Sequence, residues 1–121
     1  MYTILIVDDS RTFRRLLVQA LEPEGYDVIE VESGLQALKL LADTTPNLII
    51  SDLHMADMSG IEFIKHVRAA PALIDLPVLI LTTEQDNSYR ELARRAGASA
   101  WYEKPFQETA LQDAVRSLLS R

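Results

Sequence analysis

Short aliphatic runs alternate along the chain with longer segments in which hydrophobic residues recur every three or four positions. The runs are rich in β-branched and aliphatic residues and predict strands at residues 2–7, 28–31, 48–51, 78–82 and 99–102. The segments between them show a helical period, and the clearest stripe is that of Phe13, Leu16, Leu17, Ala20 and Leu21. The pattern therefore predicts five strands alternating with five helices.

Polar residues at the segment ends support this division. Ser10 stands directly before the first helical stripe, in the position of an N-cap. Ser59 with Glu62, and Ser88 with Glu91, have the spacing of a capping box. We therefore expect the third and fourth helices to begin just after Ser59 and Ser88.

The strands are apolar throughout rather than alternating, which is typical of a parallel sheet that is covered on both faces. Right-handed crossovers between parallel strands place helices on each face of such a sheet. The predicted fold class is therefore α/β, a doubly wound five-stranded parallel sheet with five helices. Sheets of this class bind ligands beyond the carboxyl ends of their strands.

Composition excludes several classes of protein. The 121 residues, 48% of them hydrophobic and 25% charged, predict one folded domain over residues 1–121. The absence of cysteine excludes disulfides, a thiol nucleophile and Cys-ligated metal sites. A net charge of −6 disfavours direct nucleic-acid binding. No apolar run approaches the roughly 20 residues of a membrane span, so a cytoplasmic location without membrane contact is expected.

Charged and hydroxyl side chains follow the predicted strands at their carboxyl ends. Asp8 and Asp9 follow the first strand, Asp52 the third, Thr82 ends the fourth, and Lys104 follows the fifth. If these strands are neighbours, the side chains share one edge of the sheet. Two carboxylates about 4 Å apart repel by roughly 4 kcal/mol at an effective dielectric constant of about 20. A bound hard cation relieves this repulsion, and oxygen ligands suit Mg²⁺.

This set of residues also suits phosphoryl transfer. An aspartate beside Mg²⁺ is able to act as a nucleophile and form an aspartyl phosphate. Lys104 would neutralise one phosphoryl oxygen, and Thr82 would donate a hydrogen bond to another. The chain has no glycine-rich nucleotide-binding motif, so another molecule must bring the phosphoryl donor.

Segments from end to end of the chain resemble the receiver domains of bacterial response regulators, in their CheY-like single-domain form. The resemblance implies a flavodoxin-like fold with strand order 2-1-3-4-5. The matching sequences are ILIVDDS at 4–10, LIISDLHM at 48–55, SG at 59–60, VLILT at 78–82 and KPF at 104–106.

The resemblance also implies a role for each acidic residue. Asp52 would accept the phosphoryl group from a phosphohistidine of a sensor kinase or a phosphotransfer protein. Asp9, Asp52 and the backbone carbonyl of His54 would ligate Mg²⁺ directly. Asp8 would act mainly through a metal-bound water.

A second group of implied roles concerns switching. Lys104, with a cis bond to Pro105, would pair with the acceptor, Thr82 would move toward the phosphoryl group, and Trp101 would change rotamer. The face formed by the fourth helix, fifth strand and fifth helix would then bind a downstream target protein, in chemotaxis or another pathway. A monomer is expected, with dimerisation on phosphorylation left open.

Several residues near the matching motifs differ from the usual family pattern. His54 stands where Asn is common, Ala56 where Pro is common, Thr83 where a small residue is usual, and Trp101 where Tyr or Phe is usual. From their placement we expect His54 and Glu84 to flank the site and to set the dephosphorylation rate. The pairs Arg14-Arg15 and Arg94-Arg95 are typical of solvated helix faces.

Three alternatives remain at this point. A haloacid-dehalogenase-like phosphohydrolase also uses an Asp nucleophile with Mg²⁺, but requires Asp-x-Asp after the first strand. A flavodoxin-like cofactor module would need a phosphate-binding loop where Asp8 and Asp9 stand. A receiver-like adaptor that works without phosphorylation would not need the full set of acids, threonine and lysine.

Overall fold

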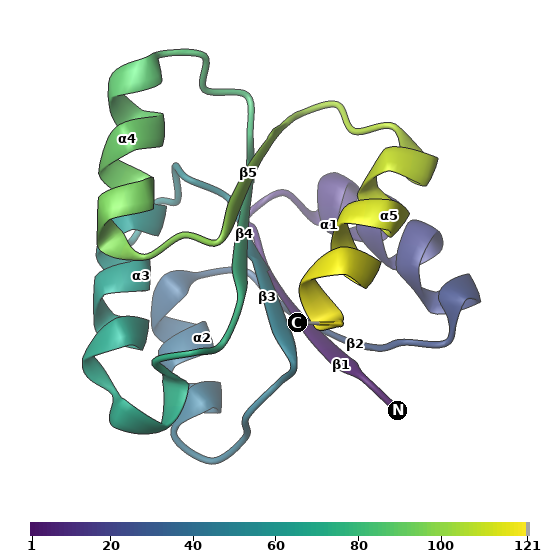
Figure 1. Ribbon diagram of the computed structural model, residues 1–121, viewed down its shortest axis with the longest axis horizontal. Coiled ribbons are helices and arrows are strands. Elements are labelled where there is room, and N and C mark those ends of the chain that lie inside the picture. The colour runs from purple at the N-terminus through teal and green to yellow at the C-terminus, as the bar shows by residue number, and fades with distance from the viewer. Residues whose placement is uncertain (121) are drawn as a thin grey trace.

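The computed structural model of the protein describes residues 1–120 and contains a single five-stranded parallel sheet. The strands lie in the order β2-β1-β3-β4-β5, which confirms the order 2-1-3-4-5 (Figure 1). Their bounds are β1 Thr3–Val7, β2 Asp27–Val31, β3 Leu48–Ser51, β4 Val78–Thr82 and β5 Ala100–Glu103.

Five α-helices cover the two faces of the sheet in a doubly wound arrangement. Helices α1 and α5 lie on one face, and α2, α3 and α4 lie on the other (Figure 1). Their bounds are α1 Arg11–Leu21, α2 Gly34–Leu41, α3 Gly60–Ala69, α4 Asn87–Ala96 and α5 Glu108–Leu119. Short 3-10 helices follow α1 at Glu22–Glu24 and α3 at Pro71–Leu73.

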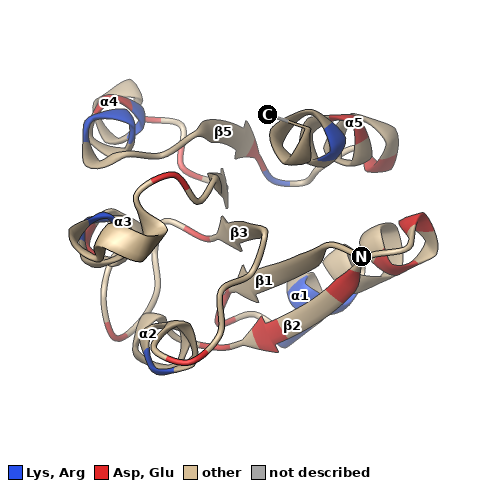
Figure 2. Cartoon of the chain, turned by 60° about the horizontal axis from the view of Figure 1, so that its bottom comes forward, with Lys and Arg blue, Asp and Glu red and all other residues tan. Residues whose placement is uncertain are grey.

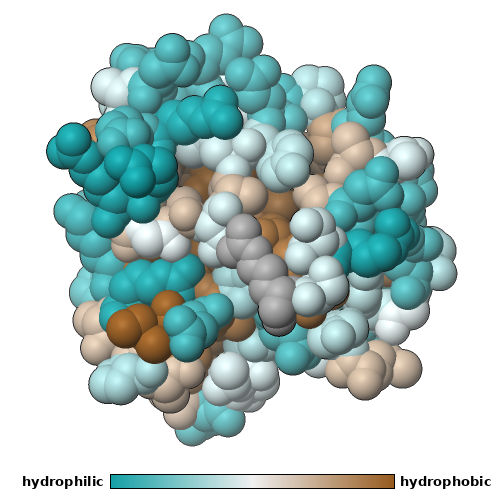
Figure 3. Space-filling model, in the orientation of Figure 1, coloured by the Kyte–Doolittle hydropathy of each residue, from teal (hydrophilic) through white to brown (hydrophobic). Residues whose placement is uncertain are grey.

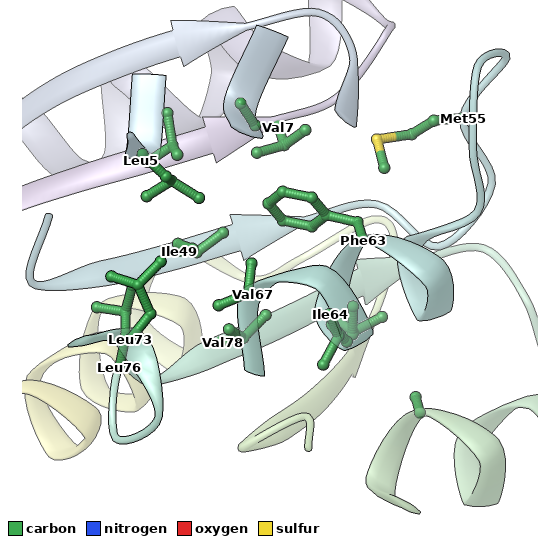
Figure 4. Packing of buried hydrophobic residues seen from close by; sticks show 14 of the residues in the cluster. Leu5, Val7, Ile49, Met55, Phe63, Ile64, Val67, Leu73, Leu76 and Val78 are labelled. Atoms are coloured by element: carbon green, nitrogen blue, oxygen red, sulfur yellow. The ribbon is translucent and has the colours of Figure 1, made fainter. Parts of the chain in front are cut away.

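Each face of the sheet has its own hydrophobic core, because successive residues of a strand point to opposite sides. Leu5 and Val7 of β1 pack under α2, α3 and α4, where the buried ring of Phe63 lies over the sheet (Figure 4). Ile4 and Ile6 pack on the other face, under α1 and α5. Burial on both faces explains why the central strands β1, β3 and β4 are almost entirely apolar. The expectation that all strands are apolar throughout is wrong for the edge strands β2 and β5, which are only partly buried and carry acidic residues.

The helix caps agree with the sequence at two of the three predicted positions. The Ser10 hydroxyl accepts a hydrogen bond from the amide of Phe13, and that of Ser59 accepts one from the amide of Glu62. The expected cap at Ser88 is wrong, because α4 begins earlier and is capped by Asp86. The Asp86 carboxylate accepts from the Ser88 amide, and a negative charge is favoured at a helix N-terminus.

Within residues 1–120, no helix combines the length and the hydrophobicity that a membrane crossing requires.

Candidate functional site

Three aspartates meet beyond the carboxyl ends of β1 and β3. Each of Asp8, Asp9 and Asp52 offers a carboxylate oxygen, and these oxygens lie within 4.8 Å of one another. Charged segments beyond the arrowheads of β1, β3 and β5 are visible in Figure 2. The topology produces this cluster, because β1 and β3 are adjacent and the Asp52 amide donates to the Val7 carbonyl at 3.0 Å.

Lys104 enters the cluster from the segment after β5. Its Nζ donates to Asp8 Oδ2 at 2.8 Å and to Asp52 Oδ2 at 3.2 Å. The ammonium also lies 4.0 Å from the centroid of the Phe13 ring. The Lys104 side chain is 12% exposed, so both ion pairs are largely shielded from solvent. The Lys104–Pro105 peptide bond is cis.

Asp8 is the most deeply buried of the three acids. Burial raises the pKa of the Asp8 carboxyl, although its hydrogen bonds to Lys104 and to the Ser10 amide act in the opposite direction. The nearby Asp52 carboxylate also raises the pKa of Asp8. The cluster thus holds three carboxylic acids and one ammonium, which pairs with two of them, Asp8 and Asp52.

The donors available in this cluster fit a hard divalent cation. Asp9 is exposed, and its carboxylate accepts no hydrogen bond from the residues that the structure describes. Asp52 Oδ1 accepts from the Leu53 amide at 2.7 Å, while its Oδ2 faces Lys104. Carboxylate oxygens with access to water match the preference of Mg²⁺. The metal role of the His54 carbonyl stays a prediction.

Thr82 lies at the end of β4, beside the strand that leads to Lys104. The Lys104 amide donates to the Thr82 carbonyl at 2.9 Å. The Thr82 side chain is buried, and its Oγ1 accepts from the Glu84 amide at 3.2 Å. Trp101 pairs with Ile80 in the sheet, is half-buried, and packs on the side of α2, α3 and α4.

His54 and Glu84 are in direct contact. His54 Nε2 lies 2.8 Å from Glu84 Oε1, and this hydrogen bond lowers the pKa of the Glu84 carboxyl. The His54 ring also packs edge-on against Tyr89 of α4, with centroids 5.3 Å apart. The segment after Asp52 is thereby joined to α4, and the sequence pattern did not predict this Tyr89 contact.

The expected solvated position of Arg14 is wrong. Its side chain is 12% exposed, and its guanidinium donates to the Asp8 carbonyl oxygen at 2.6 Å and to Glu30 Oε1 at 3.3 Å. Its neighbour Arg15 is exposed, as predicted. An arginine pair on a helix gives no signal for which member turns inward, and the acidic Glu30 on β2 was the only available indication.

Comparisons with known proteins agree with this geometry. The sequence profile of the response regulator receiver domain matches residues 4–116. Chemotaxis protein CheY1 of Helicobacter pylori is 35% identical over 118 residues, which cover 96% of this chain and 95% of that protein.

Two solved structures show the same fold. The receiver domain of a signal transduction histidine kinase from Syntrophus aciditrophicus has a TM-score of 0.92 at 35% identity, covering 99% of this chain and 91% of that one. The chemotaxis response regulator CheY4 of Vibrio cholerae has a TM-score of 0.92 at 33% identity, covering 98% of both chains.

The chain belongs to the response regulator receiver domain family. Within that family it is CheY-like, and it is a phosphorelay receiver, a signalling domain rather than a classical enzyme. Receiver domains bind Mg²⁺ in an acidic pocket, and the three aspartates of this chain form a cluster whose carboxylate oxygens are close enough together to hold a metal ion. Membership also implies a histidine kinase or phosphotransfer partner and a downstream target.

Proposed function

We propose that this domain accepts a phosphoryl group on Asp52 in a Mg²⁺-dependent reaction and thereby changes its affinity for a partner protein. The observation that carries the proposal is the meeting of Asp8, Asp9 and Asp52 with the ammonium of Lys104. Asp52 is the acid best suited to be the acceptor, because it is only partly buried and its Oδ2 also faces the ammonium of Lys104. Asp8 is less suited, since its carboxylate is buried and therefore less accessible to a phosphoryl donor.

In the proposed reaction an Asp52 oxygen attacks the phosphorus of a phosphohistidine. A P–O bond forms as the P–N bond breaks, and the imidazole leaves with the electron pair of that bond. Mg²⁺, when bound by Asp9, Asp52 and the His54 carbonyl, supplies positive charge against the phosphoryl oxygens. Hydrolysis reverses the modification, because water attacks the phosphorus and restores the carboxylate. The domain's only chemistry is thus on itself.

Lys104 and Thr82 would connect the acceptor to a change of conformation. The Lys104 ammonium would pair with a phosphoryl oxygen, and the Thr82 hydroxyl would donate to another. Both contacts exist only in the modified protein, so they favour one conformation over the other. A nearly complete change of population requires about 5.5 kcal/mol of differential interaction, which a few charge-assisted hydrogen bonds are able to supply.

The proposed output surface is the face of α4, β5 and α5. A groove of about 530 Å³ lies between α4 and β5, and Arg90, Arg94 and Trp101 are among its lining residues. Hydrophilic side chains cover the outer surface of α4, whereas hydrophobic atoms are recessed between α4 and α5 (Figure 3). A change in Trp101 would alter this groove directly. The chemotaxis relatives make a chemotaxis protein one candidate target, and the proposed resting state is a monomer.

Beryllofluoride, a stable mimic of the phosphoryl group, tests the proposal. Addition of beryllofluoride with Mg²⁺ is expected to shift the backbone NMR signals of the residues around Asp52 and along α4 and β5. The Asp52→Asn variant and the wild type without Mg²⁺ are expected to show no such shifts. Equal shifts in the Asp52→Asn variant would contradict the choice of acceptor, and steady turnover of phosphate esters would favour a phosphohydrolase instead.

A further inference from the structure

Arg14 is a partly buried cation, and one of its hydrogen bonds goes to the backbone of the acid pair Asp8-Asp9. It lies in the first turn of α1, with Nη1 2.6 Å from the Asp8 carbonyl oxygen and Nε 3.3 Å from Glu30 Oε1. One guanidinium therefore connects α1, the segment that follows β1, and strand β2. The planar guanidinium of an arginine holds these two donor nitrogens in a fixed relative geometry.

The carbonyl that Arg14 binds belongs to the peptide bond between Asp8 and Asp9. All other polar atoms of Asp8 are also held: the amide by the Val31 carbonyl, Oδ1 by the Ser10 amide, and Oδ2 by Lys104. Since a peptide group is planar, fixing this carbonyl fixes the plane from which Asp9 continues. Within residues 1–120 the Asp9 carboxylate has no hydrogen-bond donor, so its position depends on this backbone.

The positive charge of Arg14 acts on metal binding in the opposite direction to its backbone contact. Its positive charge lies close to the cluster and disfavours the approach of a cation, although Glu30 offsets much of that charge. Removal of the charge alone would therefore tighten the binding of a divalent cation. Loss of the backbone anchor would weaken it, because ligands that are no longer held in place lower metal affinity. The two effects are separable by experiment.

We propose that Arg14 is a positioning residue for the metal site, holding the Asp8–Asp9 peptide so that the Asp9 carboxylate faces Asp52. The proposal rests on the proposed function, because it takes the aspartate cluster to be the Mg²⁺ site. Its role is indirect: Arg14 binds the backbone of the ligands rather than the metal.

The test compares Arg14→Gln, Arg14→Lys and Arg15→Gln by calorimetric titration with Mg²⁺, at a temperature where urea unfolding shows every variant to be folded. Arg15 is the matched control, since it is the exposed arginine next in the chain. Arg14→Gln is expected to bind Mg²⁺ about tenfold more weakly, as loss of an outer-shell partner does. Arg14→Lys is expected to bind Mg²⁺ more weakly than the wild type but more tightly than Arg14→Gln. Arg15→Gln is expected to bind Mg²⁺ as the wild type does.

The possible contrary results are distinct. Tighter Mg²⁺ binding by Arg14→Gln, with Arg14→Lys equal to the wild type, would show that Arg14 acts only through its charge. Lower stability with unchanged Mg²⁺ affinity would show a purely structural role, and either result overturns the proposal. An Asp9→Asn variant separates failure of this proposal from failure of the proposed function. If Asp9→Asn binds Mg²⁺ as the wild type does, the aspartate cluster is not the metal site.

Discussion

His54 Nε2 and Glu84 Oε1 lie 2.8 Å apart, and their contact joins the segment after the acceptor strand to the segment after β4. Both side chains stand two residues beyond a proposed site residue, His54 beyond Asp52 and Glu84 beyond Thr82. From this placement we propose that the pair borders the region from which water would approach a phosphoryl group on Asp52. Any movement of the segment after β4 would also stretch or break this hydrogen bond.

Replacement of His54 or Glu84 by Ala is expected to accelerate loss of the phosphoryl group, because the flank of the site then opens to water. The measurement is the decay of phosphorylated protein after removal of the donor. His66→Ala is the matched control, since His66 is the other histidine and lies exposed on α3. An unchanged decay rate after replacing both His54 and Glu84 would show that the pair does not control loss of the phosphoryl group.

Gly60 is expected to tolerate no side chain, because it packs against the backbone of Asp52, the proposed acceptor. A Cβ at Gly60 would overlap the Asp52 carbonyl oxygen and lie 2.9 Å from Leu53 Cα, and backbone atoms have little freedom to move away. Gly60→Ala is therefore expected to cost about 1–3 kcal/mol of unfolding free energy and to displace Asp52.

Urea unfolding and phosphoryl uptake measure the two effects of Gly60→Ala. Gly34→Ala is the control, since the nearest atoms to its Cβ would belong to the flexible side chain of Met58 rather than to backbone. Equal losses of unfolding free energy and of phosphoryl uptake in the two variants would show that the contact of Gly60 with the backbone of Asp52 is not the cause.

Asp57 is expected to stabilise the protein in a pH-dependent way. Its carboxylate accepts from the amides of Leu35, Gly34 and Met58, and these hydrogen bonds, that of Leu35 first, lower the pKa of Asp57. A carboxyl whose pKa is lowered in the folded state contributes stability above its unfolded pKa and loses it as the pH falls through its folded pKa.

Asp57→Ala is accordingly expected to cost about 1 kcal/mol at neutral pH, as loss of a helix cap does. The difference in urea midpoint between this variant and the wild type should shrink as the pH falls into the acid range. A difference in urea midpoint that stays constant down to pH values below the folded pKa of Asp57 would show that the charge of Asp57 does not contribute to stability.

Trp101 is the only tryptophan of the chain and is half-buried beside the groove between α4 and β5. If it changes rotamer on phosphorylation, its fluorescence emission should shift when beryllofluoride and Mg²⁺ are added. The Thr82→Ala variant should bind beryllofluoride but show a smaller shift, because the proposed link through the threonine hydroxyl is missing. An emission spectrum that does not change in the wild type, while NMR shows beryllofluoride bound, would contradict the switch role of Trp101.

The sequence predicted those features that follow from regular patterns. The strand core at Ile4–Val7 could be recognised because a strand buried on both faces must be apolar. Asp8 and Asp52 could be recognised because each follows such a strand, and Lys104 because it follows the last predicted strand. The bounds were less well defined: β1 begins at Thr3, and β5 begins at Ala100.

What the sequence did not predict depends on long-range contacts between side chains. Ser88 has the spacing of a cap, but the charged Asp86 is a stronger acceptor in the same turn and begins the helix earlier. The inward turn of Arg14 requires the facing Glu30, and the packing of His54 on Tyr89 requires α4 to lie beside the acceptor segment. Such contacts form only in the folded protein and produce no periodic pattern in the sequence.

Phosphoryl transfer from acetyl phosphate tests the assignment of Asp52 most directly. The intact mass of the wild type should increase by one phosphoryl group in the presence of Mg²⁺ and stay unchanged when Mg²⁺ is removed by a chelator. The Asp52→Asn variant, which keeps the size of the side chain but lacks the nucleophilic carboxylate, should remain unmodified under both conditions. Modification of Asp52→Asn at the wild-type rate would contradict the account.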